Sequence, residues 1–137
     1  MIDRRTAPYA ALLLRLVVGA LFILHIYRKF VITGIGAWSD NLAHNGYPRI
    51  VVIYILVAEF CAAVALPLGL WTRWVSLLAF PLIAGAAQFW LVRKGFWFGD
   101  AGGEFPLLWA AALLVLVLLG DGAYALRWPR RRAALAG

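Results

Sequence analysis

The sequence predicts an all-α polytopic membrane protein, in which four transmembrane helices form one antiparallel bundle over residues 1–137. Of the residues, 65% are hydrophobic and the mean hydropathy is +0.87, well above the average of soluble domains. A hydrocarbon core about 30 Å thick needs about 20 helical residues to cross it. Four apolar stretches reach or approach this length: residues 9–30, 49–70, 74–92 and 104–120.

The first span is expected to begin beside Pro8, because proline is tolerated in the first turn of a helix. Arg4 and Arg5 ahead of an apolar run are also typical of a secretory signal peptide. However, Arg15 interrupts the run, no small-residue cleavage pattern follows, and three further spans come later. We therefore expect the first span to stay in the mature protein.

Residues 31–48 form the longest predicted connection and contain several glycines and asparagines. Within this connection, Ile35, Trp38 and Leu42 recur at helical spacing. The pattern favours a short helix that lies in the membrane interface.

The second and third spans are expected to form a tight antiparallel hairpin, because only a few residues separate them after Pro67. Pro81 lies in the middle of the third span and should kink it by removing one backbone hydrogen bond. Residues 93–103 then form an outer loop with basic and aromatic side chains. The fourth span opens with Glu104 and Pro106, which both favour a helix N-terminus.

The net charge is +7, but the basic residues flank apolar helices, which indicates anionic lipid headgroups and no nucleic-acid partner. An even number of spans places both termini on one side, with seven Lys and Arg against five on the other. The seven are Arg4, Arg5, Arg73, Arg127, Arg130, Arg131 and Arg132, and the five are Arg28, Lys29, Arg49, Arg93 and Lys94. Both termini are therefore predicted to be cytoplasmic. The single cysteine, Cys61, excludes an internal disulfide and is expected to be a buried packing residue.

Three ionisable residues, Arg15, His25 and Glu59, lie inside predicted spans together with the neutral Gln88. On the first helix, Arg15, His25 and Lys29 fall within an arc of roughly 80°, a face that should look into the bundle. Measured from the cytoplasmic end, Arg15 lies about 9 Å deep and Glu59 about 16 Å deep. Gln88 and His25 follow at about 21 Å and about 24 Å.

Two interpretations of Glu59 stay open. A charge at mid-bilayer is costly, and Arg15 within reach would form a structural salt bridge that joins the first two spans. Alternatively, Glu59 and His25 line a small polar cavity for a ligand or a proton.

His25 cannot form a bis-histidine haem site alone, and the chain has neither a CxxCH motif nor a cluster with metal-ligand spacing, so no metal is expected. Its ring can hydrogen-bond a quinone or another lipid-soluble ligand, Gln88, or a backbone group. Lys29 either anchors the helix at the interface or faces the same cavity as His25. Glu104 is interpreted as a helix-start charge rather than a site residue, although it stays in the candidate set.

Several short motifs occur in a fixed order along the chain. They are LLLRLVVGALFILHIYRKF (residues 12–30), NGYP (45–48), AEF (58–60), LPLGLWTRW (66–74) and GGEFPLLWAAALLVLVLLGDGAY (102–124). By the order and spacing of these motifs, the chain resembles the DoxX/DoxD-like family of small four-helix bacterial membrane proteins. The resemblance covers nearly the whole chain, and only the end departs, with Arg127 and Trp128 where members often carry an acidic residue.

The resemblance implies a location in the bacterial cytoplasmic (inner) membrane. It also implies that five residues stand at the family's typical polar positions: Arg15, His25, Lys29, Glu59 and Glu104. DoxD-type subunits are part of a thiosulfate–quinone oxidoreductase, and some relatives are linked to membrane redox complexes. Most members have no established activity, so the resemblance implies the fold more than the chemistry.

The first functional hypothesis is a redox-linked membrane subunit that binds a quinone or a similar lipid-soluble ligand, with His25 and Glu59 as hydrogen-bond or proton partners. No catalytic residue is assigned and no electron carrier is visible in the chain, so electrons would come from a redox partner protein or a reduced substrate. The alternative is a non-catalytic scaffold or assembly factor for partner proteins. A small-solute transporter is less favoured, because four helices leave little lumen unless the chain forms a homo-oligomer.

Overall fold

The structure, a computed structural model, describes residues 3–126, and this part of the chain is helical without β-strands. Its elements are α1 (Ala7–Tyr27), the π-helix η1 (Arg28–Thr33), α2 (Ile35–His44), α3 (Arg49–Leu68), α4 (Thr72–Lys94), the short η2 (Phe98–Asp100) and α5 (Glu104–Leu119). The basic residues at 127–132, which enter the orientation prediction, lie outside the described residues.

Three of the expected spans are confirmed as helices that are long and apolar enough to cross a membrane: Ala7–Thr33, Arg49–Leu68 and Thr72–Lys94. Helix α5 has 16 residues, so at 1.5 Å per residue it extends only about 24 Å. The fourth crossing therefore stays a prediction.

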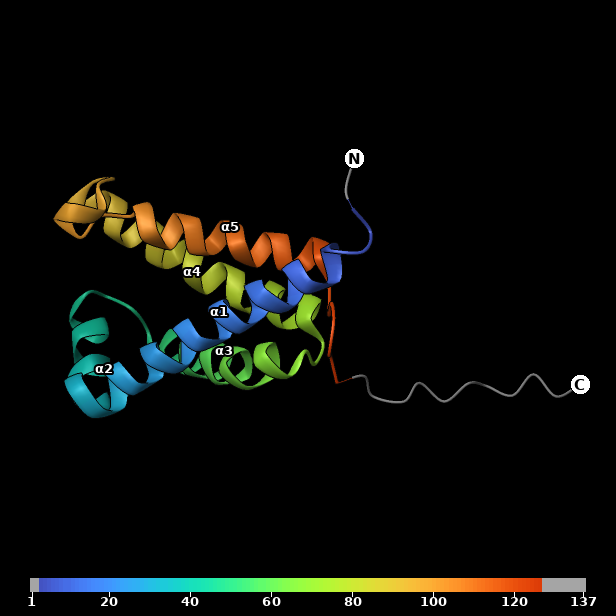
Figure 1. Ribbon diagram of the computed structural model, residues 1–137. Helices are drawn as coiled ribbons and strands as arrows, with labels where there is room; N and C mark the ends of the chain where they lie inside the picture. Colours follow the sequence, from blue (N-terminus) through green and yellow to red (C-terminus); the bar gives the residue numbers. More distant parts are fainter. Residues whose placement is uncertain (1–2, 127–137) are drawn as a thin grey trace, which may run out of the picture.

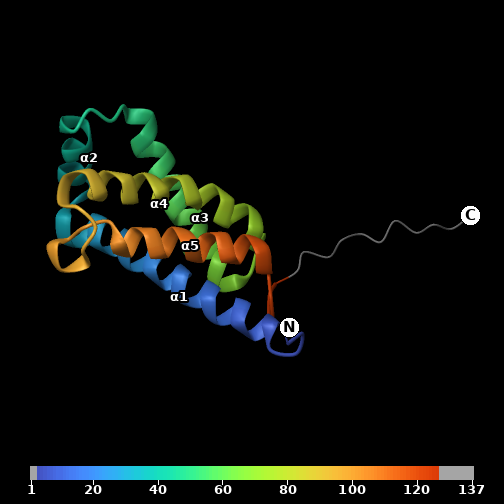
Figure 2. The same cartoon turned by 90° about the horizontal axis from the view of Figure 1, so that it is seen from above.

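Helices α1, α3, α4 and α5 lie side by side and form a closed ring, in which α1 contacts α3, α3 contacts α4, α4 contacts α5, and α5 contacts α1 (Figures 1 and 2). The start of α1 and the end of α5 lie at one end of the ring, and α2 lies at the other (Figure 1). We call the first the terminal end and the second the α2 end. The predicted short helix in the long connection is confirmed as α2.

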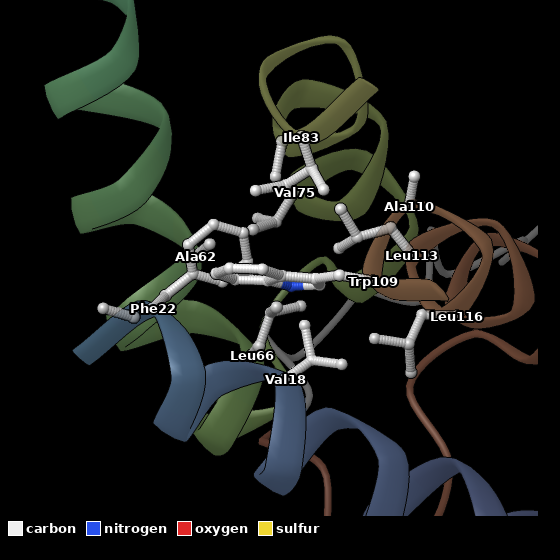
Figure 3. Packing of buried hydrophobic residues seen from close by; sticks show 12 residues of the cluster. Val18, Phe22, Ala62, Leu66, Val75, Ile83, Trp109, Ala110, Leu113 and Leu116 are labelled. Carbon is white, nitrogen blue, oxygen red and sulfur yellow. The ribbon is translucent and has the colours of Figure 1, made fainter. Parts of the chain in front are cut away.

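The core lies inside this ring. Figure 3 shows the indole of Trp109 in the middle of the cluster, with side chains of α1, α3 and α4 around it. Large apolar side chains also cover the outside, where Leu13 is 65% and Leu118 is 78% exposed. An outer surface of this kind is matched to lipid rather than to water.

Small residues let the helices approach closely. A Cβ added at Gly19 of α1 would lie 2.6 Å from the Pro67 side chain of α3, so the two backbones meet where a larger residue would not fit. Ala58 and Ala62 of α3 and Ala79 of α4 are almost fully buried in the same way. Close packing over small residues is what holds helices together in lipid.

The expected tight hairpin between the second and third spans is confirmed, because only residues 69–71 join α3 to α4. Gly69 adopts φ +71°, and the N–H groups of Gly69 and Leu70 donate to the carbonyls of Leu66 and Ala65, which closes α3 with a left-handed cap. Helix α4 continues through Pro81 as one element.

The expectation that Cys61 is a buried packing residue is wrong. Its side chain is exposed rather than buried, because it faces outward from α3 beside Trp71 of the α3–α4 turn and Trp74 of α4.

Candidate functional site

The candidate site is an ion pair between Lys29 and Glu59 inside the helix ring. Lys29, in the π-helix that extends α1, donates a hydrogen bond from Nζ to Oε1 of Glu59 in α3. The side chains are 13% and 3% exposed, so both charges are largely withdrawn from the surroundings. A buried charge in a membrane needs a partner of opposite sign, and each of these residues supplies it for the other.

The π-helix positions Lys29 between two elements. Such wide turns are uncommon and often occur at functional sites. The Lys29 ammonium lies 4.5 Å from the ring centroid of Trp38 in α2, which is a cation–π contact. Lys29 therefore joins α2 to the centre of α3.

His25 lies in the last turn of α1, four residues before Lys29 in η1. Its ring packs edge-on against Trp109 of α5, with 4.8 Å between the ring centroids, and Phe22 contacts the same indole at 4.8 Å. His25 Nδ1 lies 2.9 Å from the carbonyl oxygen of Leu21. A carbonyl only accepts, so Nδ1 carries a proton, and in a neutral ring Nε2 is then the acceptor.

Buried side-chain polar atoms without a hydrogen-bond partner among residues 3–126 occur on Arg15, Glu59, Thr72, Ser76 and Trp109. Two of these atoms bear on the candidate site. They are the second carboxylate oxygen of Glu59 and the indole nitrogen of Trp109. Glu59 is 2% exposed and Trp109 is 5% exposed. Unpartnered polar atoms at such depth are rare and mark a place where a ligand could gain a hydrogen bond.

Arg15 does not pair with Glu59, so the salt bridge expected between these residues is wrong. Arg15 is fully buried at the terminal end, where its guanidinium donates to the carbonyl oxygens of Asp121 and, at 2.7 Å, Ala123. Lys29 lies about 21 Å further along the helix axis and is the residue that reaches Glu59. The acceptors of Arg15 are main-chain oxygens that follow α5, and no side-chain pattern reveals them.

Asp121 is a polar residue that sequence reasoning missed. Its carboxylate accepts a hydrogen bond of 3.0 Å from the backbone N–H of Thr72, the first residue of α4. A carboxylate at this place satisfies one free N–H at the start of the helix and favours the helix dipole. An aspartate directly after an apolar helix and Gly120 was the available signal.

Gln88 and Glu104 do not join the ion pair. Gln88 is exposed and lines a groove between α4 and α5, so its expected place beside His25 is wrong. Glu104 is exposed at the start of α5 and accepts a hydrogen bond of 2.9 Å from the backbone N–H of Phe98. This contact fits its interpretation as a helix-start residue.

The structure thus brings together Lys29 and Glu59 with His25 one turn away, and separates Arg15, Gln88 and Glu104 from them. Within residues 3–126, no three side chains of metal-ligating type come together. The arrangement provides one buried cation, one buried carboxylate oxygen and one imidazole nitrogen, with the rings of Trp38 and Trp109 beside them.

Comparison with known proteins gives one match. The sequence model of the DoxX family matches residues 10–94, which run from α1 to the end of α4 and make up more than half of the chain. No curated protein and no solved structure matches the chain. The family match agrees with the order of motifs along the chain and with the apolar helices of the fold. The chain therefore belongs to the DoxX family.

Proposed function

We propose that this protein is a membrane subunit that binds a small lipid-soluble ligand of the quinone type beside the Lys29–Glu59 pair, as part of a redox-linked complex. The observation that carries the proposal is the Glu59 carboxylate, of which one oxygen is bound by Lys29 and the other has no partner among the described residues. In a hydrocarbon surrounding, a hydroxyl group offered to that oxygen would gain more than it does in water.

The groups at the site can meet either form of such a ligand, because Glu59 and His25 offer acceptors while the indole N–H of Trp109 offers a donor. The free oxygen of Glu59 accepts hydrogen bonds, and so does the Nε2 atom of His25 when the ring carries its single proton on Nδ1. A quinol carries two hydroxyl donors, whereas a quinone carries only carbonyl acceptors. Oxidation of a quinol to a quinone releases two electrons and two protons. In the proposal, His25 and Glu59 exchange the protons with the bound ligand, and a partner protein exchanges the electrons.

Extraction tests this proposal. The protein is purified in native lipid discs, and its lipid extract is analysed by mass spectrometry for quinones and quinols. We expect the wild-type protein to retain a quinone-type ligand at a stoichiometric level, above the content of discs that hold an unrelated membrane protein. Glu59→Gln should lose the ligand, because the amide replaces an accepting oxygen with a donor.

Asp40→Asn is the matched control, because Asp40 is an exposed carboxylate on α2 and its change should leave ligand content as it was. Circular dichroism and a melting curve establish that the Glu59→Gln protein is folded. Ligand content that is equal in wild type, Glu59→Gln and the disc blank would refute the proposal.

The alternative function, a non-catalytic scaffold for partner proteins, is favoured by a different observation. Two surface grooves are lined by α4 with α5, and by α3 with the start of α4, and neither of these two includes Lys29 or Glu59. On this view the ion pair only fixes the fold. A scaffold would carry no ligand but would co-purify with one discrete partner in mild detergent.

For the location, we infer that α5 is a fourth, antiparallel span in the bacterial inner membrane and that both termini are cytoplasmic. In support, residues 121–126 return to the terminal end, where Ala123 N–H donates to Pro8 O and Leu126 N–H donates to Leu68 O, each at 2.9 Å.

A further inference from the structure

A groove of about 560 Å³ runs between α4 and α5 on the outside of the helix ring. Alanines of both helices line it, among them Ala84 and Ala111, and Leu114 and Val92 lie along it. Val92 is 79% exposed, so it forms a rim rather than a floor. Helix α4 is long and apolar enough to cross a membrane, and α5 beside it is a shorter apolar helix. With α5 as the fourth span inferred above, this groove opens into the membrane.

Gln88 is the one polar side chain that lines the groove. It is exposed, and its amide makes no hydrogen bond with another described residue. It lies six positions before Lys94 at the end of α4, which places it about 9 Å inside that end. An acyl chain offers neither a donor nor an acceptor to this amide, so the monomer leaves it unsatisfied in the hydrocarbon region.

We propose that a second copy of this chain occupies the groove, so that α4 and α5 of two molecules pack about a two-fold axis close to Gln88. A primary amide is its own complement, since its N–H donates while its carbonyl oxygen accepts. A two-fold axis brings the same residue of both copies together, and two Gln88 side chains then satisfy each other. Small side chains at Ala84 and Ala111 allow the close helix approach that membrane helix pairs need.

The proposal does not depend on the ligand of the Lys29–Glu59 site, which lies inside the ring, so either proposal can fail without the other. The acyl chains of a lipid molecule would fill the volume of the groove but would offer the amide no hydrogen bond. A protein of another kind would need its own matching polar group at this depth. A second copy has that group by symmetry.

Cross-linking in lipid tests where two copies meet. In a Cys61→Ala background, Gln88→Cys should form a disulfide-linked dimer on mild oxidation in liposomes at low protein density. The matched control is Leu24→Cys on α1, which is 60% exposed on a different helix and should remain monomeric. Equal cross-linking at both positions, or none at position 88, would overturn the proposed interface.

Single-molecule photobleaching of labelled protein in liposomes measures the strength of association. Gln88→Leu keeps the size but removes the amide, and we expect it to weaken the dimer roughly tenfold, which is the usual size of one polar contact between membrane helices. Ala111→Phe should weaken it further, because Ala111 is exposed and the larger ring would enter the groove without disturbing the core. A wild-type protein that stays monomeric at every density, or a dimer that neither substitution weakens, would contradict the proposal.

Discussion

At the scale of single residues, the two basic groups on the inner face of α1 have different acceptors. Lys29 binds the Glu59 carboxylate inside the ring, and Arg15 binds main-chain carbonyls at the terminal end. The difference follows from the chemistry of the groups. A planar guanidinium holds two carbonyl oxygens at once, whereas an ammonium on a flexible stem can reach one carboxylate oxygen.

A double-mutant cycle on Lys29 and Glu59 should show strong coupling. Glu59→Leu alone leaves a buried ammonium unpaired and should lower the free energy of unfolding by about 3–5 kcal/mol. Lys29→Met together with Glu59→Leu should recover most of this loss, because neither charge remains. Reversible unfolding in mixed micelles measures the free energy of unfolding of each variant.

The companion cycle on Arg15 and Glu59 is the control. These residues make no contact, so the effects of Arg15→Leu and Glu59→Leu should add to within about 0.5 kcal/mol. Strong coupling between Arg15 and Glu59, with none between Lys29 and Glu59, would mean that the ion pair is assigned to the wrong residue.

Arg15→Lys should destabilise the protein although it keeps the charge. An ammonium cannot hold the carbonyls of Asp121 and Ala123 in the same bidentate way, so we expect a loss of about 1.5–3 kcal/mol. Arg4→Lys, at an exposed position, should change stability by less than about 0.5 kcal/mol. Equal melting temperatures for both variants would argue against a structural role for the Arg15 guanidinium.

At the scale of elements, the α3–α4 turn and the segment after α5 form one unit at the terminal end. Gly69 in the turn lies against Arg15, since an added Cβ would be 2.2 Å from Nη1 of that residue. Asp121 binds the first N–H of α4, and Leu126 N–H binds the last residue of α3. The ends of α1, α3, α4 and α5 are thereby joined through backbone groups that would otherwise lack partners.

Gly69→Ala should therefore cost at least about 1–2 kcal/mol, because the residue needs a left-handed conformation and its Cβ would displace the guanidinium. Gly85→Ala is the matched comparison. Gly85 lies inside α4, and nothing lies within 4 Å of an added Cβ, so alanine should raise stability by about 0.5–1 kcal/mol. Melting curves that moved in the same direction for both variants would contradict this explanation.

At the scale of the whole molecule, the ring places polar contacts inside and apolar side chains outside, as a protein in lipid requires. Its ends also differ. The terminal end is closed by the segment after α5, whereas the α2 end carries Trp38 against Lys29. A ligand at the Lys29–Glu59 site would therefore lie nearer to the α2 end than to the terminal end.

Cysteine accessibility in inside-out and right-side-out vesicles tests the arrangement in the membrane. In a Cys61→Ala background, cysteines at the exposed positions Asp3 and Leu126 should react from the cytoplasmic side. Cysteines at Asp40 and Gly99, at the other end, should react from the opposite side. Reaction of positions 99 and 126 from the same side would show that α5 does not cross the membrane.

The sequence by itself determined the apolar helices, the short helix in the long connection, the tight α3–α4 hairpin and the inner face of α1. These follow from hydropathy, helical period and turn residues, which are local properties of the chain. Among the polar residues, the sequence singled out Glu59, His25 and Lys29, and it left open whether Glu59 pairs with Arg15 or lines a cavity with His25. Only the tertiary structure decided that pairing, because it depends on how far α1 slides along α3 and on where backbone carbonyls after α5 come to lie. It also turned Gln88 and Cys61 outward, since the rotation of a helix that is apolar on nearly all sides is set by packing with its neighbours and not by its own pattern.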